Sequence, residues 1–153
     1  MRNTSFTEFW SAQWSSFYSG TPSKTMSILV VEDDVFLKPL IRQLISSVAP
    51  GAEIHWSTGV SDARKLLRKK KFDLIIADCL LGGDSGLVLW DYCKEKHPKI
   101  HMLMMSGLSA KTFEKLVGEK RALPPFVQKP FNIRECQGMI ADLLEPLPTG
   151  GRA

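Results

Sequence analysis

The sequence has little of what marks membrane, secreted or thiolate-metal proteins. No apolar run among its 153 residues approaches the length needed to cross a bilayer. Arg2 is not followed by an uninterrupted apolar stretch, so the start does not resemble a secretory signal peptide. The cysteines Cys79, Cys93 and Cys136 form no CxxC pair, which argues against a zinc site or a disulfide framework. We therefore expect a cytoplasmic protein with buried free thiols and no membrane partner.

The sequence is basic, but it lacks the motifs that accompany nucleic-acid recognition. Its net charge is +4, and lysine and arginine crowd the segment 64–71. A cluster of this kind can bind nucleic acid. It also suits a solvated helix end, where cations interact favourably with the helix dipole. Because no aromatic residues interleave with these cations, we favour the solvated helix end and expect no nucleic-acid partner.

Length and composition fit one globular domain with a terminal extension on each side. Hydrophobic residues make up 44% of the chain and charged residues 24%. Residues 1–25 are rich in Ser and Thr and carry aromatic residues three or four positions apart. We expect a flexible extension or a short amphipathic helix there. The domain is predicted to span 26–145, and the Pro- and Gly-rich residues 146–153 are expected to form a flexible tail.

From Met26 onward, short apolar runs alternate with segments of helical periodicity. The runs predict five strands, at 28–31, 52–56, 74–77, 100–105 and 126–127. A helix is expected after each strand, and Asp34 is expected to cap the first of these helices. This alternation predicts an α/β doubly wound parallel sheet with helices on both faces. Ligands of such folds bind at the carboxyl ends of the strands.

Polar side chains stand at these predicted strand ends. Glu32 and Asp33 follow the first strand, Asp78 ends the third, Ser106 the fourth, and Lys129 follows the fifth. Three carboxylates gathered at one edge would repel one another. A hard divalent cation relieves that repulsion, and Mg²⁺ prefers oxygen ligands. The sequence therefore predicts a magnesium site with a hydroxyl and an ammonium beside it.

The motifs that carry these residues resemble those of the response-regulator receiver family, the CheY-like domains. The matching stretches are ILVVEDD at 28–34, DLIIAD at 73–78, the turn at Gly86, MMSG at 104–107 and QKPF at 128–131. Together they cover the chain except its two ends. The resemblance implies a flavodoxin-like, five-stranded parallel sheet of order 2-1-3-4-5 with five helices.

The resemblance also implies a phosphorylation site that depends on magnesium. Asp78 resembles the phosphoacceptor of the family. Glu32 and Asp33 resemble its metal-binding acidic pair, and the backbone carbonyl of Leu80 would be a further ligand. Mg²⁺ and a neighbouring lysine would together neutralise the phosphoryl oxygens as the carboxylate attacks phosphorus.

Three further residues are implied to take part in signalling. Ser106 resembles the hydroxyl that bonds the phosphoryl group, and Lys129 the ammonium that pairs with it. Phe126 stands three residues before this lysine, where the family has its switch aromatic. A shift of Ser106 would let Phe126 turn inward. The Lys129-Pro130 peptide bond is implied to be cis.

We therefore expect a response regulator receiver that accepts a phosphoryl group on Asp78 from a histidine kinase or histidine phosphotransfer protein. It would promote its own phosphotransfer and slow autodephosphorylation without being an enzyme. The fourth helix, fifth strand and fifth helix are expected to form the surface that contacts a downstream protein.

Three alternatives to this function are considered. One is an adaptor receiver that works without phosphorylation, and another is the receiver fragment of a longer regulator. The third is a phosphohydrolase of the haloacid dehalogenase type, which places a second acid two residues after its nucleophile. Leu80 stands at that position, so the sequence argues against this enzyme.

Overall fold

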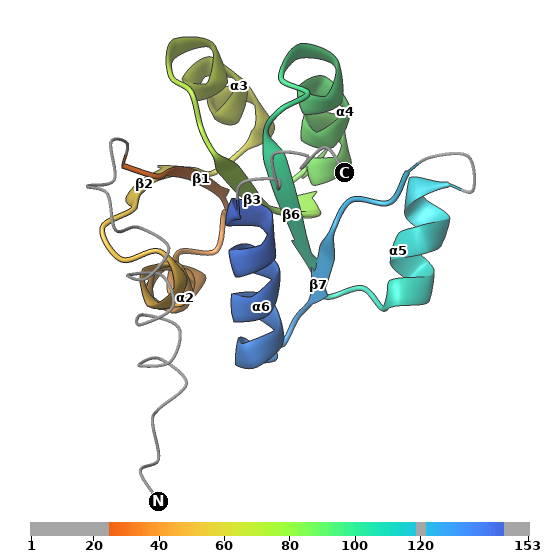
Figure 1. Cartoon of the computed structure of the whole chain (residues 1–153). Coiled ribbons are helices and arrows are strands. Elements are labelled where there is room, and N and C mark those ends of the chain that lie inside the picture. The colour runs from red at the N-terminus through yellow and green to blue at the C-terminus, as the bar shows by residue number, and fades with distance from the viewer. Residues whose placement is uncertain (1–24, 119–121, 146–153) are drawn as a thin grey trace, which may run out of the picture.

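The computed structural model describes residues 25–118 and 122–145 (Figure 1). The predicted N-terminal extension, apart from Thr25, and the predicted tail lie outside the described residues. The limits proposed for these two segments therefore stay predictions.

Five strands form one parallel sheet, and their order confirms the predicted topology. The order is β2-β1-β3-β6-β7, which is 2-1-3-4-5 when only the strands of this sheet are counted. All residues of β1 and β3 are buried, as expected for central strands covered on both faces. The strands are β1 (Ser27–Val31), β2 (Glu53–Ser57), β3 (Leu74–Asp78), β6 (His101–Ser106) and β7 (Phe126–Gln128).

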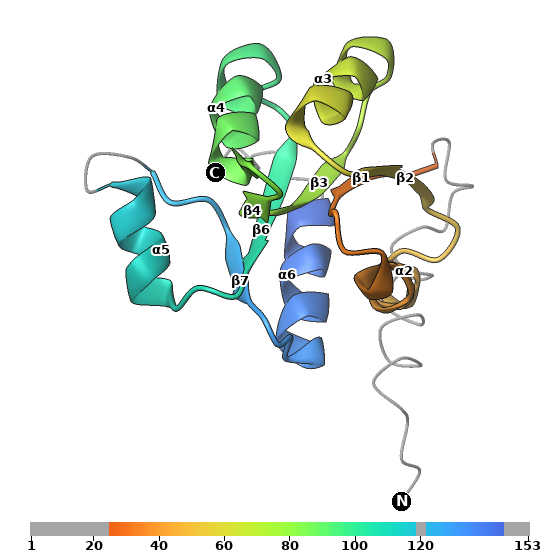
Figure 2. The same ribbon diagram turned by 180° about the vertical axis from the view of Figure 1, so that it is seen from behind.

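Five α-helices cover the two faces of the sheet (Figures 1 and 2). They are α2 (Lys38–Val48), α3 (Val60–Lys69), α4 (Gly86–Lys96), α5 (Ala110–Val117) and α6 (Ile133–Leu144). The apolar sides of α2 and α6 pack together on one face, and those of α3, α4 and α5 pack on the other. Among the described helices, none has both the length and the apolar character needed to cross a bilayer.

The start of the first long helix differs from the sequence expectation. Asp34 does not cap α2 directly. Its carboxylate accepts a hydrogen bond of 2.9 Å from the Phe36 amide and so caps a short 3-10 helix, η1 (Val35–Leu37). The α-helix then begins at Lys38 with Pro39 in its first turn, where a missing amide hydrogen costs nothing.

The glycine-rich loop after β3 forms a small hairpin that the sequence did not predict. Strand β4 (Leu80–Leu81) pairs antiparallel with β5 (Asp84–Ser85). Gly82 and Gly83 make the turn with φ angles of 54° and 129°, which residues with a side chain rarely adopt. The hairpin leads the chain from the end of β3 into α4.

Candidate functional site

The structure brings the predicted polar residues to one edge of the sheet. Asp78 is the last residue of β3 and Ser106 the last of β6. Glu32 and Asp33 follow β1, and Lys129 follows β7. Because the strands are parallel and adjacent, their carboxyl ends meet at this edge. The residues come from four strands, so the sheet topology alone assembles the group.

Three carboxylates lie close together at this edge. Ligand oxygens of Glu32, Asp33 and Asp78 are all within 4.8 Å of one another. Glu32 is 1% exposed and Asp78 7%, whereas Asp33 is open to solvent. The cluster is thus buried on one side and reachable from solvent on the other. Three converging carboxylates suit a hard divalent cation, which favours oxygen ligands.

Lys129 neutralises part of this negative charge. Its Nζ lies 2.6 Å from Oδ2 of Asp78 and 3.0 Å from Oε2 of Glu32. Burial alone would lower the pKa of Lys129, but the hydrogen bonds and charges of these two carboxylates outweigh it and raise the pKa. Lys129 therefore stays charged at neutral pH and can interact with an anionic group on Asp78.

Glu32 is held on the buried side of the cluster. One of its oxygens accepts a hydrogen bond of 3.0 Å from the Asp34 amide, and the other binds Lys129. Burial raises the pKa of Glu32, and these hydrogen bonds offset the effect only in part. Ionising Glu32 thus carries a free-energy cost, which a bound cation would reduce.

The peptide after Asp78 supports the carboxylate from the backbone side. The Leu80 amide donates a hydrogen bond of 3.0 Å to Oδ1 of Asp78, and the Leu80 side chain is 56% exposed. The next residue, Cys79, accepts a hydrogen bond of 2.9 Å on its carbonyl from the Gly86 amide. A Cβ at Gly86 would collide with the Asp78 backbone carbonyl, so glycine is required for α4 to start this close.

Ser106 is linked through backbone bonds to both neighbouring strands. Its side chain is buried, and its hydroxyl accepts a hydrogen bond of 3.1 Å from the Leu108 amide. The Lys129 amide donates a hydrogen bond of 2.8 Å to the Ser106 carbonyl, so the ends of β6 and β7 are joined. Within the described residues, no hydrogen bond links the Ser106 hydroxyl to Asp78.

Phe126, the first residue of β7, packs against a partner that sequence reasoning did not identify. Its ring is stacked on that of Phe113 in α5, with centroids 4.1 Å apart and an interplanar angle of 11°. Phe113 is 1% exposed, whereas Phe126 is half-buried. Phe113 belongs to the apolar stripe of α5, but the stripe alone does not show which strand residue it meets. The Lys129-Pro130 bond is cis, as the resemblance implied.

The family model for the response regulator receiver domain matches residues 28–141. The chain belongs to the response regulator receiver family. This receiver is similar to the signal receiver domain of a DNA-binding response regulator from Colwellia psychrerythraea, with 25% identity and a TM-score of 0.67. The match covers 79% of this chain and 99% of that one.

Two further similar proteins are described as transcriptional regulators. A two-component transcriptional regulator from Clostridium phytofermentans shares the fold with a TM-score of 0.68 at 21% identity, covering 78% of this chain and 93% of that one. A Cyanophora paradoxa protein described as probable transcriptional regulator ycf29 is 28% identical over 126 residues, which is 78% of this chain. The match covers 56% of the Cyanophora protein. The receiver thus spans about half the length of this curated relative.

Proposed function

We propose that this receiver accepts a phosphoryl group on Asp78 from the phosphohistidine of a histidine kinase or histidine phosphotransfer protein. An oxygen of Asp78 would attack phosphorus, forming an O–P bond while the P–N bond breaks and the imidazole leaves. The observation that carries the proposal is the environment of this one carboxylate. It ends a central strand, lies within 4.8 Å of two other carboxylates and has an ammonium 2.6 Å away.

The residues present fit a magnesium ion. Glu32, Asp33 and Asp78 offer three carboxylates, and the backbone carbonyl of Leu80 would complete the protein ligands. When bound, Mg²⁺ would neutralise charge on the phosphoryl oxygens. The raised pKa of Glu32 supports this assignment, because a cation at the cluster would reduce the cost of keeping Glu32 ionised.

Lys129 and Ser106 would sense the phosphoryl group. Phosphorylation would place new negative charge beside the ammonium and would offer acceptor oxygens to the buried Ser106 hydroxyl. Ser106 would shift toward them, and its hydroxyl, which accepts a hydrogen bond from the Leu108 amide, still has its own hydrogen to donate. Since the Ser106 carbonyl binds the Lys129 amide, both strand ends would move together. Phe126 would then slide on Phe113 and change the surface formed with α5.

We propose that signalling uses the face formed by α5, β7 and α6. Phe126 opens β7 and stacks on α5, so a change at Ser106 would reach this face directly. Leu116 in α5 is 49% exposed and offers a partner protein an apolar contact. A cytoplasmic location is proposed because the free, buried cysteines suit a reducing compartment. The partial coverage of the Cyanophora relative favours one alternative, a receiver within a longer regulator.

The proposed function is tested by incubating the full chain with acetyl phosphate and measuring its intact mass. We expect one phosphoryl group per chain with MgCl₂ and none with EDTA. Labelling to the same extent in EDTA would contradict a role for the metal. No labelling under either condition, together with binding to a partner, would instead favour the phosphorylation-independent adaptor.

A further inference from the structure

A pocket lies at the edge of the sheet opposite the three carboxylates. Its volume is about 910 Å³, within the range of small-molecule sites. It is bordered by the residues just before β3 and β6, and by the carboxyl-terminal ends of α3, α4 and α6. The length of β3 therefore separates this pocket from Asp78, and the two sites do not share residues.

The lining of this pocket carries strong positive charge. Two carboxylates, Asp73 and Glu145, also line it. The cations, which come from two helix ends and the loops after them, are Arg68, Lys69, Lys70, Lys71, Lys96 and Lys99. Segments that are distant in the sequence thus bring like charges to one concave surface. We call it the basic pocket.

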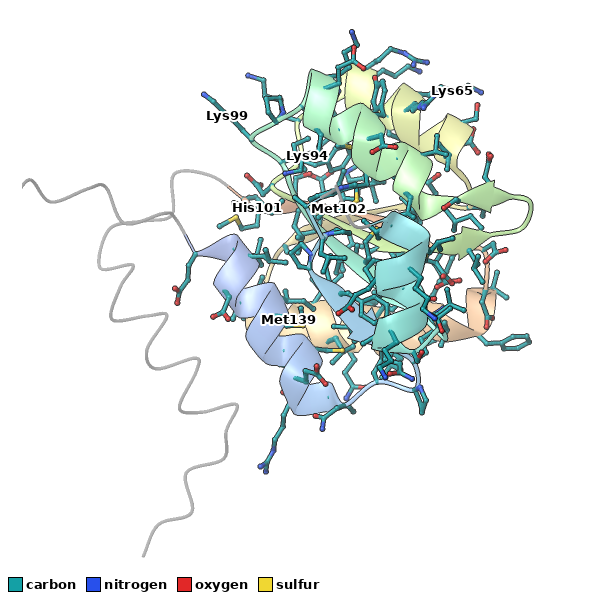
Figure 3. The ribbon with its side chains drawn as sticks, turned by 90° about the vertical axis from the view of Figure 1, so that its right-hand side faces the viewer. Lys65, Lys94, Lys99, His101, Met102 and Met139 are labelled. Carbon is teal, nitrogen blue, oxygen red and sulfur yellow. The ribbon has the colours of Figure 1, made fainter. Side chains whose placement is uncertain are left out.

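Within the described residues, two of these six cations form an ion pair with an acidic side chain. Lys70 lies 2.7 Å from Glu53, and Lys96 lies 2.8 Å from Glu95. In the part of the chain that the structure describes, the other four form no ion pair with an acidic side chain. Those four are Arg68, Lys69, Lys71 and Lys99. Figure 3 shows Lys99 at one corner of the domain, on the side of His101 and far from Lys65.

The lining also contains apolar side chains. Leu67 and Phe72 are buried in the core behind the pocket, and Ile100 and Leu143 are half-buried. A ligand for this pocket therefore needs an apolar part for Ile100 and Leu143 and several negative charges for the cations. Solvated lysines on one convex helix would offer positive charge but no apolar surface.

We propose that the basic pocket binds a small organic polyphosphate of the nucleoside triphosphate class. Its base would contact Ile100 and Leu143, and its phosphates would bind Lys69, Lys71 and Lys99. Charge complementarity does not favour an occupant from either terminal segment of this chain. Residues 1–24 contain one acidic side chain, Glu8, and residues 146–153 contain none.

The test is a calorimetric titration of the full chain with ATP, inorganic triphosphate, adenosine, polyglutamate and duplex DNA. EDTA is present so that no metal links a phosphate to the acidic cluster at Asp78. We expect saturable binding of one ATP, weaker binding of triphosphate and no saturable binding of adenosine. The backbone amide NMR signals of Lys71 and His101 should shift on ATP binding, while that of Ser106 should not.

Paired variants locate the binding surface. Lys71→Gln combined with Lys99→Gln should weaken ATP binding about tenfold, because each partly solvated contact contributes a modest energy. The matched control combines Lys65→Gln with Lys111→Gln, which removes the same charge outside the pocket lining. The control should bind ATP within about twofold of the wild type, since distant surface charges are screened by salt.

Four results would overturn the proposal. They are the absence of saturable ATP binding, an equal loss in the control, binding of polyglutamate but not ATP, and much tighter binding of duplex DNA than of ATP. The last two would point to an acidic protein or to nucleic acid as the partner.

Discussion

The ammonium of Lys129 lies 3.0 Å from Oε2 of Glu32, a carboxylate that is 1% exposed. The two residues are 97 positions apart, yet the ends of β1 and β7 bring them together. Lys129 also binds Asp78 and thus holds two carboxylates with one charge. A neutral residue in place of this lysine would leave Glu32 without its counter-charge.

We predict that Lys129→Ala destabilises the protein by about 2 kcal/mol, because it strands a buried carboxylate. Mg²⁺ binding should persist, since the carboxylates remain, and MgCl₂ should restore part of the lost stability. Urea unfolding with and without MgCl₂ measures both effects, with Lys111→Ala as the control. The variant should also lose the phosphorylation-dependent change in partner binding. A variant that keeps this change would show that Lys129 does not sense the phosphoryl group.

In the absence of metal, Glu32→Gln should stabilise the protein at neutral pH, in contrast to Lys129→Ala. Burial raises the pKa of Glu32 in the folded protein, so ionising this group opposes folding. Below the ordinary pKa of Glu, the wild type and the variant should be equally stable. As pH rises from the ordinary pKa to the raised pKa, the wild type loses stability relative to the variant, which should unfold at higher urea. MgCl₂ should stabilise the variant less than the wild type. A variant less stable than the wild type at neutral pH in EDTA would contradict this assignment.

The phosphoryl group on Asp78 should be slow to hydrolyse. The Leu80 amide binds Asp78 and the Leu108 amide binds Ser106, so both leucines border the carboxylate edge. Neither side chain can orient a water molecule, and such help contributes about a hundredfold or more where it exists. Leu80→Asn and Leu108→Glu should therefore speed the decay of labelled protein after the donor is removed. Leu116→Asn, on α5, is the control. Decay no faster than in the wild type would show that lifetime is set elsewhere.

The cysteines should be almost inert in the folded protein. Burial raises the pKa of Cys93 and of Cys136 to about 11. At pH 8 this lowers the reactive thiolate fraction about a hundredfold relative to an ordinary thiol. Reaction with a disulfide reagent should be slow in buffer and fast in concentrated urea. Fast reaction of either thiol without urea would contradict the buried core described here.

The sequence predicted the sheet because its central strands are short apolar runs that end in polar residues. The run before Asp78 shows both features, and the strand order then came from the family resemblance. The carboxylates, Ser106 and Lys129 were all placed correctly at one edge. The hairpin at Leu80 was missed because its strands are two residues long and show no periodicity.

Other features depend on contacts that periodicity cannot specify. The stacking of Phe126 on Phe113 is set by how α5 lies on β7. The sequence showed only part of the basic pocket, namely the cluster of cations at 64–71. Lys96 and Lys99 join them because α3 and α4 end at the same edge of the sheet. Likewise, only the side-chain geometry shows that the Lys129 ammonium forms ion pairs with both Glu32 and Asp78.

The most direct test of the account is to map the residue that acetyl phosphate labels. The full chain is treated with acetyl phosphate and MgCl₂, reduced with borohydride to mark the acyl phosphate, digested and analysed by mass spectrometry. The account predicts that Asp78 carries the mark, that Asp78→Asn abolishes it, and that the nearby Asp84→Asn retains it. Full labelling of Asp78→Asn at another carboxylate would contradict the account.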